Sequence, residues 1–121
     1  AGYKRASLIT SDEERFEHLM RSSKFPIQII WAGKPYPVDY PAISEFNQLV
    51  YLSKQYHNMA VLIGYELALS KRLKQAADCW MNNPRVPREA SGTSGMTAAM
   101  NGAVQGVATT VARAPFMKLE R

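Results

Sequence analysis

Two periods of apolar residues alternate along the first hundred positions of the chain. Short apolar runs, each ended by glycine or asparagine, are typical of strands, whereas apolar residues spaced three or four apart are typical of amphipathic helices. The short runs predict strands over residues 27–32, 59–63 and 76–81. The helical spacing predicts helices from Ser11 to near Ser22 and over residues 42–56, 65–75 and 93–101.

The first of these helices begins with a capping pattern. Ser11 is followed three residues later by Glu14, and in such a capping box each side chain accepts a hydrogen bond from the backbone N–H of the other residue. Phe16, Leu19 and Met20 then share one apolar face. We therefore expect Ser11 to be the N-cap of an amphipathic helix.

Helices and strands alternate in order, which predicts an α/β fold with a parallel sheet and crossover helices. We expect a three-layer, Rossmann-like arrangement with one sheet of three or four strands. Residues 104–111 are predicted as an edge strand, and the remainder to Arg121 as a loose terminus without a clear period. Ligands of such folds bind beyond the carboxyl ends of the strands. Several residues that follow strands should therefore converge there, namely Lys34, Tyr65, Arg85, Arg88 and Glu89.

A glycine-rich motif carries the strongest functional signal. The residues from Arg88 to Met96 read Arg-Glu-Ala-Ser-Gly-Thr-Ser-Gly-Met and run directly into good helix formers. A loop of small residues that opens a helix leaves backbone N–H groups at the positive end of the helix dipole, which favours an anion. Glu89 adds an acceptor for hydroxyl groups, so a sugar phosphate suits the motif better than bare phosphate. The alternative is a turn that only reverses the chain, although a simple turn needs fewer small residues.

Composition and charge narrow the range of partners. The chain has 121 residues, enough for one domain, and a formal net charge of +5. Its basic residues are scattered, which is typical of a solvated surface and compatible with a phosphate ligand, so we expect no nucleic-acid partner. No apolar run approaches the ~20 residues that span a bilayer, and we expect no membrane partner.

Cysteine and histidine usage bears on location and on metals. Cys79 is the only cysteine, so no disulfide forms within the chain, which is typical of a reducing compartment and predicts a cytoplasmic protein. The apolar run around Cys79 predicts a buried, inert thiol. His18 and His57 lack a second ligand at metal spacing, and we expect no metal site.

The glycine-rich motif, followed by Asn101-Gly102, resembles the signature of the α-glucan phosphorylases, which include the glycogen, starch and maltodextrin phosphorylases. Four further segments resemble the family in matching order, namely Tyr3-Lys4-Arg5, Ile29 to Lys34, Tyr65 to Leu69 and Ala77 to Arg85. The resemblance extends over residues 3–103. It identifies residues 1–103 as part of a C-terminal phosphorylase-like domain and leaves residues 104–121 as a divergent tail.

The resemblance implies a fold of two Rossmann-like domains with the active site between them. It implies transfer of glucosyl units between α-1,4-glucan and phosphate, which gives glucose 1-phosphate, with pyridoxal phosphate as the cofactor. Residues matching the phosphate-binding pair of the family are Lys4 and Arg5, and we expect Arg88 to add positive charge beside them. The hydroxyl groups of glucose would be held by Glu89 and by the backbone of Ala90, Ser91 and Gly92. The cofactor phosphate would be cradled by Thr93, Ser94 and Gly95.

The chain also departs from the family. The family binds its cofactor as a Schiff base on a lysine directly after the methionine that matches Met96, and Thr97 stands at that position here. Because a hydroxyl group cannot form a Schiff base, we expect no covalent cofactor, although the phosphate cradle can remain. Residues 104–121 do not match the continuation of the family, and nothing matches its N-terminal domain.

We therefore expect a fragment of an α-glucan phosphorylase or of a related glucosyltransferase. It would supply half of an active site and be inactive by itself, because half a cleft cannot position both substrates. A partner chain that supplies the N-terminal domain is one way to complete that active site. Two alternatives remain open: a stand-alone module that binds phosphate or a sugar phosphate, and a structural subunit without catalysis.

Overall fold

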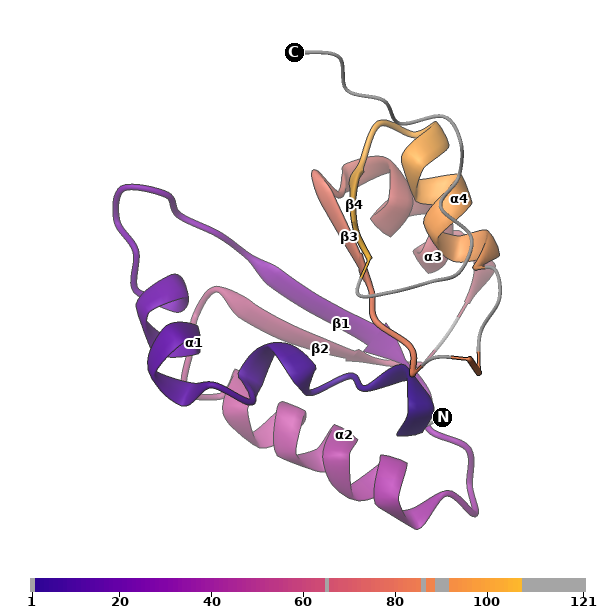
Figure 1. Ribbon diagram of the computed structural model, residues 1–121, viewed down its shortest axis with the longest axis horizontal. Helices are drawn as coiled ribbons and strands as arrows, with labels where there is room; N and C mark the ends of the chain where they lie inside the picture. Colours follow the sequence, from indigo (N-terminus) through magenta and orange to yellow (C-terminus); the bar gives the residue numbers. More distant parts are fainter. Residues whose placement is uncertain (1, 65, 86, 89–91, 108–121) are drawn as a thin grey trace. The chain divides into compact units, whose positions relative to one another are not determined.

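The computed structural model describes residues 2–64, 66–85, 87–88 and 92–107 of the chain (Figure 1). The chain divides into two compact units, Ala1–Arg72 and Leu73–Arg121, and each unit contains one two-stranded sheet. Helix α3 (Leu67–Ala76) spans the boundary between them. None of the helices in the described ranges has the length and apolar character needed to cross a bilayer.

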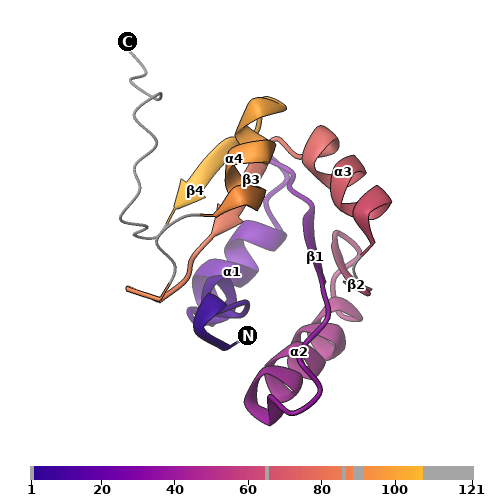
Figure 2. The ribbon, with the colours of Figure 1, turned by 90° about the vertical axis from the view of Figure 1, so that its right-hand side faces the viewer.

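The first unit is built on two parallel strands that a helix connects (Figure 2). Strand β1 (Ile29–Gly33) pairs along its whole length with strand β2 (Met59–Ile63). Helix α2 (Tyr40–Ser53) crosses between them and packs against β2. This βαβ arrangement is preceded by the 3₁₀ turns η1 (Gly2–Lys4) and η2 (Leu8–Thr10) and by helix α1 (Glu13–Met20).

Large apolar side chains form the core of the first unit. Phe16, Met20, Leu49 and Met59 are buried and form one cluster, and the ring of Phe16 meets Tyr56 edge to face with centroids 5.6 Å apart. Half-buried side chains from the inward face of the two strands pack against this cluster, namely Ile29, Trp31 and Val61. The helices of this unit are therefore held on their sheet by interlocking large side chains.

Aspartate side chains cap α1, which precedes the two strands, and α2, which connects them. Asp12 is the N-cap of α1 and accepts a hydrogen bond from the N–H of Arg15 at 3.1 Å, so the prediction of Ser11 as the cap is wrong. The hydroxyl of Ser11 instead donates to the first carbonyl of η2 at 2.7 Å, because this turn brings that carbonyl within reach. Asp39 caps α2 by accepting from the N–H of Ala42 at 3.2 Å, which starts the helix two residues earlier than predicted.

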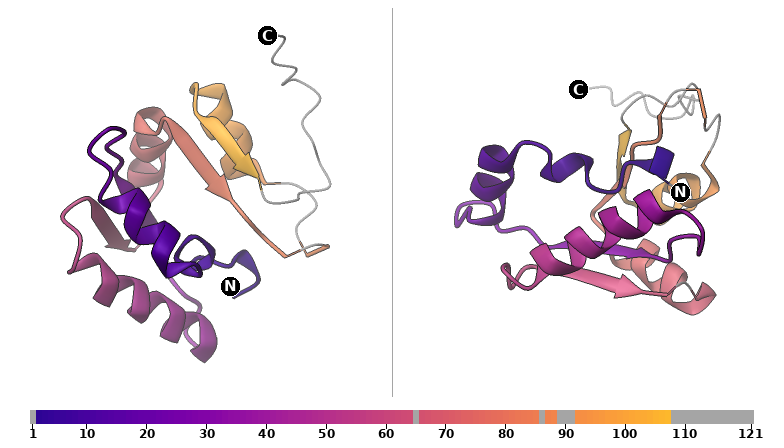
Figure 3. Two further views of the ribbon diagram at one scale, coloured as in Figure 1. Left: turned by 60° about the vertical axis from the view of Figure 1, so that its left-hand side comes forward. Right: turned by 90° about the horizontal axis from the view of Figure 1, so that it is seen from below.

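The second unit repeats the parallel βαβ arrangement with small residues at the contact (Figure 3). Strand β3 (Cys79–Asn82) pairs along its whole length with strand β4 (Val104–Val107). Helix α4 (Thr93–Met100) connects them and packs against both. Its buried positions are Gly95 and Ala98. Because neither residue carries a long side chain, the helix lies close to the side chains of the two strands beneath it.

The prediction of an α/β fold with parallel strands is confirmed, but the described strands form two pairs rather than one sheet of three or four. Each pair is joined by a crossover helix, which is what the alternation of periods encodes. The alternation does not encode whether strands of different pairs hydrogen-bond, so a three-layer sheet stays a prediction. The first four residues of the predicted strand 104–111 form β4, and its remainder lies outside the described residues.

The cysteine is exposed, so the expectation of a buried thiol is wrong. Exposure alternates along β3, with Cys79 and Met81 exposed and Trp80 and Asn82 half-buried. The amide of Asn82 lies toward Gly95 of α4, so the period of two places the thiol on the opposite face of the strand pair.

Candidate functional site

The glycine-rich motif leads into the first turn of α4, as the sequence predicts. Gly92 is the N-cap with an extended backbone (φ −127°, ψ 105°), and its carbonyl accepts the N–H of Met96 at 3.2 Å. The N–H groups of Thr93, Ser94 and Gly95 belong to the first turn, where no intrahelical acceptor exists. No side chain in the described part of the chain caps this turn. As far as the described residues go, these N–H groups can therefore bind an anion at the positive end of the helix dipole.

The direction of the chain places this turn beyond the carboxyl end of β3, because α4 crosses from β3 back to the parallel strand β4 (Figure 3). Two side-chain amides lie beneath it. A Cβ atom built at Gly95 would be 2.9 Å from Nε2 of Gln105 and 3.5 Å from Nδ2 of Asn82. The turn thus occupies the position at which parallel α/β units bind ligands.

Thr97 stands where the resemblance places the lysine of the cofactor. Its hydroxyl donates within the helix, to the carbonyl of Thr93 at 2.9 Å and to that of Ser94 at 3.1 Å. Its own carbonyl accepts from the side-chain amide of Asn101 at 2.8 Å, at the end of the helix. The side chain therefore closes hydrogen bonds inside α4 and offers no amine, so the residues present do not fit a Schiff base at this position.

Arg88 is exposed and lies in a short turn, where its N–H donates to the carbonyl of Arg85 at 2.8 Å. Three predicted site residues that follow it, Glu89, Ala90 and Ser91, lie outside the described residues. Of the predicted site residues in this part of the second unit, the structure therefore describes Arg88 and those from Gly92 onward, but not the three between them.

The predicted phosphate-binding pair lies in the first unit, where Lys4 is the last residue of η1 and Arg5 follows it. Arg5 has a φ of +49°, the left-handed region that costs a residue with a Cβ atom roughly 1–2 kcal/mol. Its N–H donates to the carbonyl of Gly2, and its carbonyl accepts from the N–H of Leu8, both at 3.1 Å. The ammonium of Lys4 lies 5.9 Å from the ring centroid of Tyr3. Because Arg88 and the turn of α4 belong to the other unit, the convergence of these charges stays a prediction.

Within the first unit the loops after the two strands do meet. The N–H of Gly64, which directly follows β2, donates to the carbonyl of Gly33, the last residue of β1, at 3.1 Å. Lys34 follows directly and is exposed, whereas Tyr65 lies outside the described residues. The prediction that loops after strands share one edge is therefore confirmed for this pair of strands.

Sequence reasoning missed three residues that hold the segment carrying Lys4 and Arg5. The indole N–H of Trp31 donates to the carbonyl of Ala6 at 2.8 Å. The carboxylate of Glu45 accepts from the N–H of Ser7 at 2.9 Å and from its hydroxyl, and Asp39 accepts from the N–H of Gly2 at 3.3 Å. Each contact joins residues 25 to 38 positions apart, and no local pattern signals such a pairing. A half-buried indole N–H does require an acceptor, but the sequence does not say which one.

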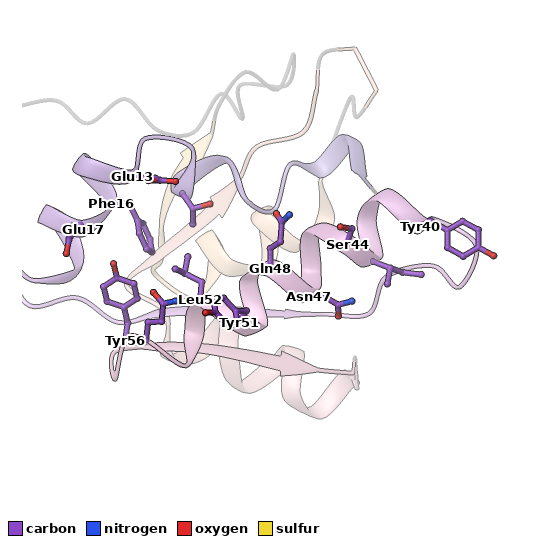
Figure 4. A pocket seen from close by; sticks show the side chains of 13 residues that line it. Glu13, Phe16, Glu17, Tyr40, Ser44, Asn47, Gln48, Tyr51, Leu52 and Tyr56 are labelled. Carbon is purple, nitrogen blue, oxygen red and sulfur yellow. The ribbon is translucent and has the colours of Figure 1, made fainter.

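A pocket of about 810 Å³ lies elsewhere in the first unit, between α1 and α2 (Figure 4). Three tyrosines and three side-chain amides contribute to its wall: Tyr40, Tyr51, Tyr56, Asn47, Gln48 and Gln55. None of the predicted site residues lines it. Among the described residues no group of three or more His, Cys, Asp or Glu side chains is placed to hold a metal ion.

No protein-family model and no solved structure matches the chain. Several proteins are similar to it. An uncharacterized protein of Methanocaldococcus jannaschii is 47% identical over 102 residues, which cover 84% of the chain and 19% of that protein. The maltodextrin phosphorylase of Thermococcus litoralis is 41% identical over 106 residues, or 84% of the chain and 13% of that enzyme. The glycogen phosphorylase of Mycobacterium tuberculosis is 39% identical over 103 residues, or 83% of the chain and 12% of that enzyme.

The chain thus spans between 12% and 19% of the length of these relatives. It is similar to one segment of glycogen and maltodextrin phosphorylases, which confirms the resemblance seen in the motifs for that segment.

Proposed function

We propose that the chain is a phosphorylase-related segment that forms the phosphate side of a glucosyltransferase active site. The observation that carries this proposal is the first turn of α4 beyond the carboxyl end of β3, which no side chain of the described residues caps and which the motif of the resemblance forms. The similarity to glycogen and maltodextrin phosphorylases supports it. In this proposal residues 1–103 belong to a three-layer, Rossmann-like C-terminal domain of a two-domain fold, and residues 104–121 form a divergent tail.

In the proposed site both backbone N–H groups and charged side chains bind the anion. The N–H groups of the turn Thr93 to Gly95 lie at the positive end of the helix dipole, which contributes only ~0.3–1 kcal/mol at an exposed site. Lys4, Arg5 and Arg88 supply charge, and a hydrogen bond to an ionised partner contributes ~1.5–3 kcal/mol. Most of the affinity for phosphate or glucose 1-phosphate should therefore come from the side chains, while the turn fixes where the anion lies.

Recognition of the sugar falls to the residues just before the helix. In this proposal the carboxylate of Glu89 and the backbone of Ala90, Ser91 and Gly92 hold hydroxyl groups of glucose. A glucosyl cation formed at an α-1,4-glucan end would be stabilised electrostatically by the bound phosphate. We expect the chain alone to be inactive, because a partner chain or further domain must close the cleft and position the glucan. The proposed setting is the cytoplasm.

Pyridoxal phosphate is the cofactor that the resemblance implies, and the chain does not fit its covalent form. The hydroxyl of Thr97 is committed to carbonyls of its own helix and has no amine to offer. The first turn of α4 suits the phosphate of such a cofactor in the same way that it suits any phosphate. We therefore propose no Schiff base at this position and retain only the cradle formed by Thr93, Ser94 and Gly95.

Calorimetric titration of the chain with inorganic phosphate and with glucose 1-phosphate tests the proposal. Arg5→Ala should weaken binding about 10- to 150-fold, the equivalent of ~1.5–3 kcal/mol. Ser94→Ala should weaken it less than about threefold, because Ser94 contributes its backbone N–H, which the substitution retains. Equal affinities of the two variants, or no binding to the parent chain, would favour a structural subunit over a phosphate site.

A further inference from the structure

We propose that Trp31 and Glu45 are positioning residues that fix the direction of the Lys4-Arg5 pair by holding Arg5 in its left-handed conformation. The inference rests on the proposed function in one respect, namely that Arg5 contacts the phosphate. It assigns a task to two side chains, one from β1 and one from α2, that lie far from Arg5 in the sequence.

The two tethers attach to the residues immediately after Arg5. The indole N–H of Trp31 donates to the carbonyl of Ala6 at 2.8 Å. The carboxylate of Glu45 accepts hydrogen bonds from both the N–H and the hydroxyl of Ser7. The chain is thereby fixed to the strand at one residue and to the helix at the next, directly beyond the unusual φ of +49°.

A positive φ at a residue with a Cβ atom persists only where the surroundings impose it. The local bonds at Arg5, which join its N–H to Gly2 and its carbonyl to Leu8, are ordinary turn contacts between neighbours. The bonds from Trp31 and Glu45 come from the folded βαβ unit and connect the turn to its core, because Trp31 packs against the buried cluster. These long-range bonds can therefore impose the conformation from outside the turn.

The direction of the Arg5 side chain depends on this φ, because a change from the left-handed to the right-handed region redirects the Cα–Cβ bond relative to the backbone on either side. Loss of the tethers therefore moves the guanidinium without removing it. A variant that lacks them should bind phosphate as poorly as one that lacks the guanidinium altogether.

The test uses the double variant Trp31→Phe/Glu45→Met of the full chain. Phenylalanine keeps an aromatic ring in the strand but has no N–H, and methionine keeps about the length of glutamate but has no oxygen to accept from Ser7. The matched control is Trp80→Phe/Glu17→Met. It makes the same two changes at the half-buried Trp80 of β3 and at Glu17, which pairs with Arg21 on the surface of α1.

Two readouts separate this inference from the proposed function. The one-bond Cα–Hα coupling of Arg5, measured by NMR, reports the sign of its φ without any ligand. Calorimetry with inorganic phosphate reports affinity. We expect the double variant to shift the coupling to the value for negative φ and to weaken phosphate binding at least tenfold, whereas the control changes affinity less than twofold. Adding Arg5→Ala to the double variant should weaken binding less than threefold further.

An unchanged coupling at Arg5 in the double variant would overturn the inference, whatever happens to affinity. A shifted coupling with unchanged phosphate affinity would also overturn it, because the tethers would then hold a turn that does not direct binding. Absence of phosphate binding by the parent chain would refute the proposed function and the directing role together, and the coupling would still decide whether the two side chains hold the turn.

Discussion

The two units of the chain reach the same parallel βαβ arrangement by opposite means. In the first, α2 is anchored by Leu49, which is 1% exposed within a cluster of large side chains. In the second, α4 is anchored by Gly95 and Ala98, which bring the helix backbone itself close to the strands. Burial of large side chains contributes more free energy per residue than burial of small ones. The first unit is thus organised for stability, and the second for close approach of backbone.

The two units also differ in how the first turn of their helices is capped. Asp12 and Asp39 satisfy first-turn N–H groups of α1 and α2 with their own carboxylates, whereas Gly92 begins α4 without a side-chain cap from the described residues. A capped helix start contributes stability but leaves less room for a ligand. Side chains thus cap the helices of the scaffold, whereas among the described residues none covers the first turn of α4, where phosphate is proposed to bind.

The largest effect should come from the core of the first unit. Leu49→Ala removes a fully buried side chain, and such truncations cost ~2–5 kcal/mol. Ala98→Gly, at the equally buried position of α4, should cost only about 1 kcal/mol, mainly through helix propensity. Urea unfolding followed by circular dichroism measures both. A Leu49→Ala cost no greater than that of Ala98→Gly would contradict the contrast between the units.

An intermediate effect is expected at the cap of α2. Asp39→Ala removes the acceptor for the N–H of Ala42 and should lower the free energy of unfolding by ~0.5–2 kcal/mol. Asp39→Asn is the matched control, because asparagine is an equally good cap and should leave stability nearly unchanged. A similar loss in both variants, seen in the same urea experiment, would contradict the assignment of this effect to the cap bond.

The smallest effect should appear at the helix contact of the second unit. Gly95→Ala gains ~0.8–1.0 kcal/mol of helix propensity, but its Cβ atom would meet Nε2 of Gln105 at 2.9 Å. The tip of a glutamine can rotate away, so the net change should stay within about 1 kcal/mol. In a Gln105→Ala background the gain should appear in full. A loss of stability that persists in that background would mean that backbone, not Gln105, limits the approach.

Strong local patterns predicted much of this architecture. The run 59–63 forms β2 with the predicted bounds, and the motif opens α4 at Thr93 as expected. The cap at Ser11 was misplaced by one residue because the preceding 3₁₀ turn offers that hydroxyl another acceptor. Pattern reasoning also gave one sheet where the described strands form two pairs, since period and order do not encode which strands hydrogen-bond.

In the candidate site, too, local features could be predicted from the sequence and long-range contacts could not. The motif from Gly92 to Gly95 could be recognised because its function depends on local backbone. The tethers from Trp31 and Glu45 could not, because they join segments 25 and 38 residues apart and depend on the tertiary fold. Sequence reasoning therefore found the groups proposed to touch the ligand and missed those that orient them.

Titration of the ¹⁵N-labelled chain with glucose 1-phosphate, followed by amide chemical shifts, shows which helix start binds the anion. We expect saturable shifts at Thr93, Ser94 and Gly95, with none at the capped starts of α1 and α2. These shifts should be lost in Gly92→Asp, whose carboxylate would cap α4 and repel the anion. Shifts spread evenly over the three helix starts, or no saturable shift in the first turn of α4, would contradict the proposed phosphate site.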